Sequence, residues 1–256
     1  MRFALGIEYD GTDYCGWQAQ RNGASVQADV EKALSFVANE PIVVVCAGRT
    51  DAGVHGQCQV VHFDTSAQRD ARAWVLGVNS QLPQAIAVRW ARTVSDEFHA
   101  RFSAQARRYR YTLINRATRP ALSRRYAAWE RQALDVDAMR AASRCLLGTH
   151  DFTSFRTVAC QAKSPVRTLH VLELERSGEQ LVMHIEANAF LHHMVRNIMG
   201  SLIEVGLGAR PVEWIADLIA ARDRTRAGIT GEARGLVFIG PRYPRAFGLP
   251  DEVCLS

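Results

Sequence analysis

The chain has 256 residues, 48% of them hydrophobic, so it is long enough to bury a sizeable core in one large domain or two small ones. No run approaches the roughly 20 uninterrupted apolar residues of a membrane helix. The first residues read as a strand, without the basic and then apolar segments of a secretory signal. We therefore expect a cytoplasmic protein. The net charge of +5 and the pI near 9.1 fit a polyanionic partner, but many proteins that bind no nucleic acid share them.

The cysteines argue against a disulfide framework and against a zinc site. There is no Cys-x-x-Cys pair and no regular spacing among them. We expect reduced thiols, most of them in the core. The six are Cys15, Cys46, Cys58, Cys145, Cys160 and Cys254.

Charge is distributed unevenly along the chain. Residues 101–125 hold eight arginines and no Asp or Glu. The chain has only two lysines, so a general preference for arginine accounts for part of this pattern. It does not account for the missing acids. A segment with one sign of charge repels itself unless a polyanion faces it, so we favour a phosphate-binding surface over a solvated face.

The first half of the sequence predicts alternating strands and helices. Residues 3–9 read as a strand that ends at the turn Asp10-Gly11. Ser25 stands where a helix N-cap is expected, and apolar residues at helical spacing follow it up to Asn39, just before Pro41. Further strands are predicted at 42–45, 57–63 and 86–90, with a second helix at 71–78.

The second half repeats this theme. Strands are predicted at 109–114, 169–174, 181–187 and 236–239, and helices at 136–147, 190–205 and 212–221. The pattern favours an α+β fold of two related lobes, each a mostly antiparallel sheet covered by helices. We expect one lobe at residues 1–105 and the other at 106–256. No low-complexity linker separates them, so we expect tightly associated lobes with the substrate in a groove between their sheets.

A glycine-punctuated loop between two predicted strands carries the chemical groups. Residues 46–56 include three glycines, and Arg49, Asp51 and His55 bring a cation, a carboxylate and an imidazole within seven residues. The residue types alone leave open an ordinary connection in which Asp51 caps a turn and Arg49 pairs with it.

The loop segment Gly48-Arg49-Thr50-Asp51-Ala52-Gly53-Val54-His55 closely resembles the catalytic-loop signature of the tRNA pseudouridine synthase A family. Other segments resemble motifs of that family in the same order, and together they span nearly the whole chain. They are Glu8-Tyr9-Asp10-Gly11 with Gly16-Trp17-Gln18, Phe98-His99-Ala100-Arg101-Phe102, Arg108-Tyr109-Arg110-Tyr111, and residues 188–197.

The resemblance implies two α+β lobes, a central basic cleft, and a homodimer in which the anticodon arm of tRNA lies across both subunits. It maps the catalytic aspartate onto Asp51, with Arg49 beside it in the site, and a base-packing aromatic residue onto Tyr109. It implies uridines 38, 39 and 40 as targets and no cofactor or metal. Near the end of the chain the match is weaker, because Val237-Phe238 stands where an aromatic and then an aliphatic residue are usual. Leu236 is expected in the uracil pocket.

The proposed chemistry suits these residue types. Both family mechanisms, attack on C1′ and removal of the C2′ proton, require an ionised carboxylate at the ribose, and the sequence does not choose between them. We expect Arg49 to favour the ionised form of Asp51 and to occupy the space left by the extruded base. The resemblance implies that Tyr109 supplies a stacking surface for that base, and the alternating strand leaves open that Tyr109 is only a residue of the sheet. Tyr111 is expected in the core.

Three other interpretations of the sequence concern metal binding and RNA binding. Adjacent residues on a helix point about 100° apart, so His192 and His193 are not expected to share a zinc ion. A noncatalytic RNA-binding module would need no Asp51. A metal-dependent nuclease using Asp51, His55, His62 and Asp64 would require divalent ions. The last two leave the ordered motifs unexplained. For Arg196, substrate contact and structural pairing stay equally open.

Overall fold

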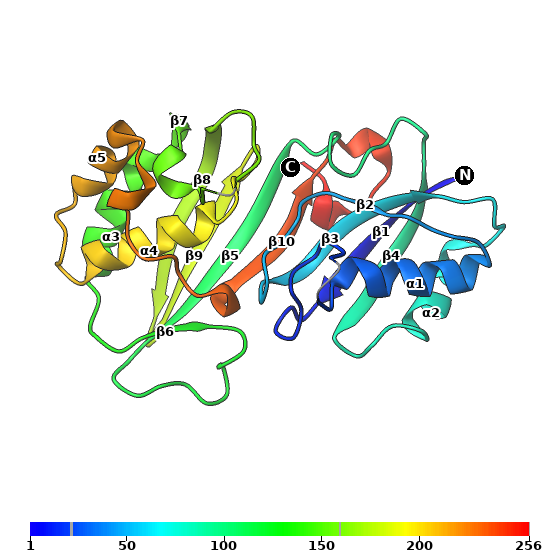
Figure 1. Cartoon of the computed structure of the whole chain (residues 1–256), viewed down its shortest axis with the longest axis horizontal. Coiled ribbons are helices and arrows are strands. Elements are labelled where there is room, and N and C mark those ends of the chain that lie inside the picture. Colours follow the sequence, from blue (N-terminus) through cyan, green and yellow to red (C-terminus); the bar gives the residue numbers. More distant parts are fainter. Residues whose placement is uncertain (21–22, 159, 256) are drawn as a thin grey trace. The chain divides into compact units, whose positions relative to one another are not determined.

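The computed structural model describes residues 1–20, 23–158 and 160–255, and the chain folds into two compact units (Figure 1). Residues 1–107 and 237–256 form the first unit, and residues 108–236 form the second. Both combine mostly antiparallel strands with helices, which confirms the predicted α+β class. Within the described residues, no helix has the length and apolar character needed to cross a bilayer.

In the first unit, four long strands lie side by side. Their order is β4 (Ile86–Val94), β1 (Arg2–Tyr9), β3 (His55–Asp64) and β10 (Leu236–Arg242), with the short β2 (Val45–Cys46) also on β3. Strand β1 runs antiparallel to both of its neighbours, whereas β10 runs parallel to β3. The three predicted strands that became β1, β3 and β4 are confirmed, each longer than expected.

Helices α1 (Val26–Ala38) and α2 (Ala71–Asn79) cover one face of this sheet (Figure 1). Alternate residues of β1 point into that core, and the ring of Phe3 lies 5.5 Å from the ring of Trp74. The predicted N-cap of α1 is confirmed, because the Ser25 hydroxyl accepts a hydrogen bond from the Ala28 amide. Asn39 ends the helix in the left-handed conformation, at φ 56°.

The strand predicted at 42–45 is wrong for most of its length, since only Val45 of that segment belongs to a strand. Side chains of α1 take over the backbone amides that a neighbouring strand would otherwise bind. The Ile42 amide donates to the Ser35 hydroxyl, and the Val44 amide donates to the Glu31 carboxylate. A β-branched run therefore lies outside the sheet here.

The C-terminal tail covers the other face of the same sheet. Tyr243 and Val253 are fully buried there, and the Trp90 indole donates to the Glu252 carboxylate at 2.8 Å. A side chain at Gly6 would overlap the Trp90 ring, so glycine allows that ring to lie flat on the sheet. Residues 237–256 thus lie in the first unit and not, as the sequence suggested, with the second lobe.

In the second unit four strands lie side by side in the order β5 (Ala106–Asn115), β9 (Gln180–Ala187), β8 (Val166–Ser177) and β7 (Gly148–Asp151). The short β6 (Ala128–Glu130) pairs in parallel with β5. The strands predicted at 169–174 and 181–187 are confirmed as the antiparallel pair β8 and β9, while β6 and β7 were not predicted. The helices are α3 (Val136–Ser143), α4 (Met194–Gly206) and α5 (Trp214–Ala221).

A buried histidine links β3 to the turn that follows β4. His62 is 5% exposed, and its Nδ1 accepts a hydrogen bond from the Ala100 amide at 3.1 Å. Burial is the largest influence on its pKa and, with the charges of His99 and Arg2, lowers the pKa to about 4, against a smaller opposing effect of Asp64. His62 is therefore neutral at pH 7, as its role of hydrogen-bond acceptor requires.

This burial predicts a pH-dependent stability. A histidine whose folded-state pKa is depressed takes up a proton on unfolding. The stability that neutral His62 contributes to the folded state is therefore lost as pH falls from about 6.5 towards 4. Between pH 7 and pH 4.5 the wild type should lose about 2 kcal/mol more unfolding free energy than His62→Gln, whose amide oxygen can still accept from Ala100. Urea unfolding of both proteins at the two pH values measures this. Equal losses would contradict the assignment.

Candidate active site

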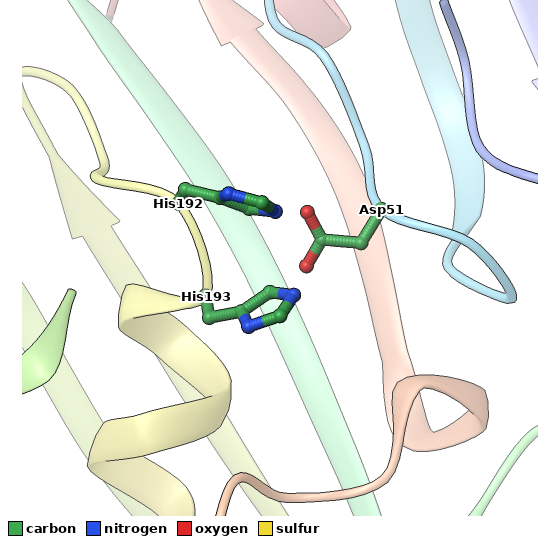
Figure 2. A group of neighbouring side chains, drawn as sticks. All are labelled: Asp51, His192 and His193. Carbon is green, nitrogen blue, oxygen red and sulfur yellow. The ribbon is translucent and has the colours of Figure 1, made fainter. Parts of the chain in front are cut away.

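Asp51 lies on the loop between β2 and β3, directly before the turn that leads into β3 (Figure 2). Its side chain is half-buried, and Asp51 is the only acidic residue among residues 46–56. The Asp51 carbonyl accepts a hydrogen bond from the Val54 amide at 3.1 Å, which closes a tight turn. Gly53 sits in this turn at φ 75°, a conformation that favours glycine.

The segment after β1 braces the Asp51 loop on one side. The Thr50 hydroxyl is hydrogen-bonded to the Tyr9 hydroxyl at 2.8 Å in a buried contact. The Trp17 amide donates to the Thr50 carbonyl at 3.1 Å, and the Gly53 amide donates to the Tyr14 carbonyl at 3.2 Å. Thr50, directly before Asp51, and Gly53, two residues after it, are therefore held from outside the loop.

Two glycines make this bracing possible because their backbones approach the loop more closely than a side chain would allow. A Cβ on Gly11 would lie 2.0 Å from the Val54 carbonyl oxygen. A Cβ on Gly16 would lie 2.7 Å from the Thr50 carbonyl oxygen, and Gly16 also has a φ of 101°. The motifs at residues 8–11 and 16–18 thus support the loop that carries Asp51.

His55 opens β3 and connects it to the same bracing segment. Its buried Nδ1 lies 3.1 Å from the Gly11 amide nitrogen and 3.1 Å from an Asp10 carboxylate oxygen. An unprotonated Nδ1 accepts from Gly11, whereas a protonated one donates to Asp10. His55 thus belongs to the support of the loop, which accounts for an imidazole at this place without a metal.

Arg107 anchors the other end of the loop. Its guanidinium donates to the carbonyl of Ala47 through two nitrogens, at 3.1 and 3.4 Å, and to the carbonyl of Ala104 at 2.9 Å. The Gln59 amide donates to the Gly48 carbonyl from the neighbouring strand. Arg107 is one of the eight arginines of residues 101–125, a segment expected from its charge to bind phosphate. In the structure it binds backbone carbonyls, a role for which its sequence position gave no signal.

Arg49 extends from the loop with an exposed side chain, two residues before Asp51. Its charge reaches the thiol of Cys46, and so does the charge of Arg101. Burial dominates there and raises the pKa of Cys46 to about 11, while the two guanidinium groups oppose that rise. The two arginines therefore place positive charge in one neighbourhood at the start of the loop.

Tyr109 belongs to the second unit, where it lies on β5. The side chain is 9% exposed, and its ring meets the ring of Phe190 edge to face, with the centroids 5.1 Å apart. Tyr111, two residues on, is fully buried, and its hydroxyl donates to the Glu232 carbonyl at 2.9 Å. The expectation that Tyr111 is a core residue is confirmed.

The segment before α4 differs from the prediction, because the helix begins at Met194 and not near Phe190. His193 precedes the helix in the left-handed conformation, at φ 65°, which is uncommon for a residue other than glycine. The rings of His192 and His193 lie 4.2 Å apart, and Figure 2 shows both on the segment that enters the helix. The helical geometry assumed for this pair was therefore wrong. The absence of a metal site stays a prediction.

Two polar residues of α4 stabilise the second unit from within. Asn197 is fully buried, where its amide donates to the Phe155 carbonyl and its oxygen accepts from Arg224 and Thr230. The Arg196 side chain donates to the Gly231 carbonyl at 2.8 Å, so Arg196 has a structural role. A contact of Arg196 with the substrate stays a prediction. Met194, Ile198 and Leu202 of the same helix are buried in the core.

A hollow of about 610 Å³ lies on the second unit, at the face of β5 and β9 that the helices leave uncovered. Arg110, Thr112, Val182 and His184 are among its lining residues. Side chains alternate between the two faces of a strand, so Tyr109 and Tyr111 point away from this hollow. It is therefore separate from the surroundings of Tyr109.

Comparison with known proteins bears directly on the Asp51 loop. The family model described as tRNA pseudouridine synthase matches residues 6–103 and 142–244, a span that includes the whole loop and its bracing segment. A tRNA pseudouridine synthase A from Stenotrophomonas maltophilia (strain K279a) is 60% identical over 256 residues, which is 100% of both chains. The chain belongs to the tRNA pseudouridine synthase A family.

Other members of the tRNA pseudouridine synthase A family match nearly as well. One from Xanthomonas euvesicatoria pv. vesicatoria (strain 85-10) is 58% identical over 255 residues, or 99% of each chain. A solved Cbf5-Nop10-Gar1 complex aligns with 98% of this chain and 51% of its own, at 10% identity and a TM-score of 0.39, and contributes nothing to the assignment. The resemblance drawn from the sequence motifs is confirmed.

The bracing of the loop predicts that Gly16→Ala is much more harmful than Gly248→Ala. Both positions have positive φ, but a side chain at Gly248 would meet nothing within 4 Å. Gly248→Ala should cost about 1 kcal/mol, and Gly16→Ala about 2–4 kcal/mol because of its added clash with Thr50. Urea unfolding measures both. Equal costs would show that the close approach at Gly16 relaxes without strain.

Proposed function

We propose that this chain converts uridines 38, 39 and 40 in the anticodon arm of tRNA to pseudouridine, with Asp51 as the catalytic carboxylate. The observation that carries the proposal is a single half-buried acid, Asp51, on a loop braced from both ends, in a chain that belongs to the tRNA pseudouridine synthase A family. A preorganised carboxylate of this kind meets the first requirement of the reaction.

The chemistry is balanced without a cofactor. The C1′–N1 bond of uridine breaks, a C1′–C5 bond forms, and one proton leaves C5 while N1 gains one. Asp51 begins the reaction either by attack on C1′ or by removal of the C2′ proton, and an ionised carboxylate serves both routes. Because composition is unchanged, no oxidant or energy source is required.

Arg49 and Tyr109 complete the proposed site. A base stacked in an RNA helix hides its glycosidic bond, so the target nucleotide must be extruded. The exposed guanidinium of Arg49 suits the space that the base leaves, and the ring of Tyr109 suits a stacking partner for the extruded base. We further propose a central basic cleft, with Leu236 in the uracil pocket.

The assembly and location follow from the same proposal. We propose that the anticodon arm lies across a homodimer, which the mass of the protein in solution would test. An enzyme that modifies many different tRNAs must recognise the shape of the RNA more than its sequence. Because tRNA is found in the cytoplasm, we propose a cytoplasmic location for the protein.

The central prediction is that Asp51→Asn abolishes the reaction but not tRNA binding. Unmodified tRNA is incubated with either protein in EDTA, and pseudouridine is mapped by chemical labelling. We expect signal at positions 38–40 for the wild type, and a loss on the order of 10,000-fold or more for the variant. No signal from a folded, tRNA-binding wild type would favour a noncatalytic RNA-binding module. Shortened RNA that depends on divalent ions would favour a nuclease.

A second prediction concerns Arg49. Its exposed side chain takes no part in a core, so Arg49→Ala should fold with wild-type stability. If the guanidinium replaces the extruded base, single-turnover rates should fall roughly 10- to 100-fold at saturating tRNA. Arg49→Lys separates charge from shape, since a point charge fills the space poorly. An unchanged rate in Arg49→Ala would remove the residue from the site.

A further inference from the structure

An exposed aromatic side chain stands close in sequence to the arginine that anchors the Asp51 loop. Phe102 is 75% exposed, although a phenylalanine is usually found in a core. Its ring stacks on the ring of His99, with centroids 4.3 Å apart and planes 29° apart, and the Arg101 guanidinium lies 5.6 Å from the same ring. Phe102 is thus held in place while most of its surface faces solvent.

The turn that carries Phe102 is built to be rigid. The His99 Nδ1 accepts hydrogen bonds from the amides of Arg101 and Phe102, both at 3.2 Å, and the Ser103 hydroxyl accepts from the His99 amide at 3.0 Å. Desolvation is the largest influence on the His99 pKa and lowers it, which favours the neutral imidazole that can accept these hydrogen bonds. The turn therefore presents Phe102 in one orientation.

The same turn is tied to the loop that carries Asp51. Arg107 donates to the Arg101 carbonyl as well as to the Ala47 carbonyl, so one guanidinium joins the two segments. Ala100 is fixed in turn by His62 and by the Tyr243 hydroxyl. All of these residues belong to the first unit. A group bound on Phe102 would therefore have a defined position relative to Asp51.

Phe36 is the natural comparison. It is 70% exposed on α1 in the same unit, yet no ring or cation contact of Phe36 is found in the described part of the chain. Single exposed apolar residues like Phe36 are common and need no explanation. Phe102 differs because its ring is stacked on His99 and flanked by the Arg101 cation, and because Arg107 joins its turn to the loop of Asp51.

We infer that the turn at residues 99–103 binds an unpaired nucleotide of the substrate RNA, whose base stacks on Phe102 while Arg101 pairs with its phosphate. An aromatic ring stacks on any base, and a guanidinium suits a phosphate, so the site fits RNA without demanding a sequence. This inference rests on the proposed function, and it adds a nucleotide contact separate from the extruded target uridine.

The test compares Phe102→Ala with Phe36→Ala in the full-length protein. The dissociation constant for unmodified tRNA is measured at fixed salt, and the single-turnover rate is measured at saturating tRNA. Phe102→Ala should weaken binding by about 10- to 100-fold, the usual effect of one lost stacking contact, while Phe36→Ala stays within about twofold of wild type. The saturating rate of Phe102→Ala should stay near that of the wild type.

Two further variants separate stacking from a structural role. Phe102→Trp retains a stacking surface and should bind tRNA like the wild type, with unchanged unfolding free energy. Arg101→Ala should make the salt dependence of tRNA binding shallower by about 0.7 in the logarithmic slope, the value for one phosphate on a single strand. If Phe102→Ala binds tRNA like Phe36→Ala, or if Phe102→Trp binds as weakly as Phe102→Ala, the inference is overturned.

Failure of this inference is distinct from failure of the proposed function. If tRNA binds but no pseudouridine dependent on Asp51 forms, the proposed function fails, and the binding data still judge Phe102. If pseudouridine forms and the Phe102 variants all bind like the wild type, only the present inference fails.

Discussion

The structure around Asp51 depends on the close approach of two backbones. The segment after β1 passes so near to the loop between β2 and β3 that Gly11 and Gly16 leave no room for a Cβ against Val54 and Thr50. Hydrogen bonds from Trp17 and to Tyr14 then fix the residues on either side of Asp51. The role proposed for Asp51 requires its carboxylate to be held within about half an ångström of its productive position, and backbone contacts of this kind restrict a loop more than flexible side chains do.

Arginine has two distinct tasks in the first unit. Arg107 spends its donors on the carbonyls of Ala47, Ala104 and Arg101, which converts one side chain into a clamp between two segments. Arg49 and Arg101 leave their guanidinium groups exposed, and the charges of both act on Cys46. The basic character seen in the sequence is thus partly structural and partly available to a polyanion. A planar guanidinium with five donors serves either task, which lysine does less well.

In the second unit, buried contacts stabilise the start of α4 and the surroundings of Tyr109. Asn197 satisfies its amide with Phe155, Arg224 and Thr230, so burying it costs little and fixes the start of α4. His193, directly before that helix, has a positive φ of 65°, which is uncommon for a residue other than glycine. The ring of Tyr109 packs against the ring of Phe190, which belongs to the segment that leads into α4.

The sequence alone determined the family, the α+β class, most strands and helices, and both ends of α1, because local propensity and capping are written in adjacent residues. Only the tertiary structure decided the rest. Residues 237–256 belong to the first unit because β10 pairs with β3. Residues 42–44 lie outside the sheet, and α4 begins only at Met194. The tertiary structure also gave Arg107 its role as a clamp. Each of these outcomes depends on partners distant in sequence, and such contacts leave no periodic signal in the chain itself.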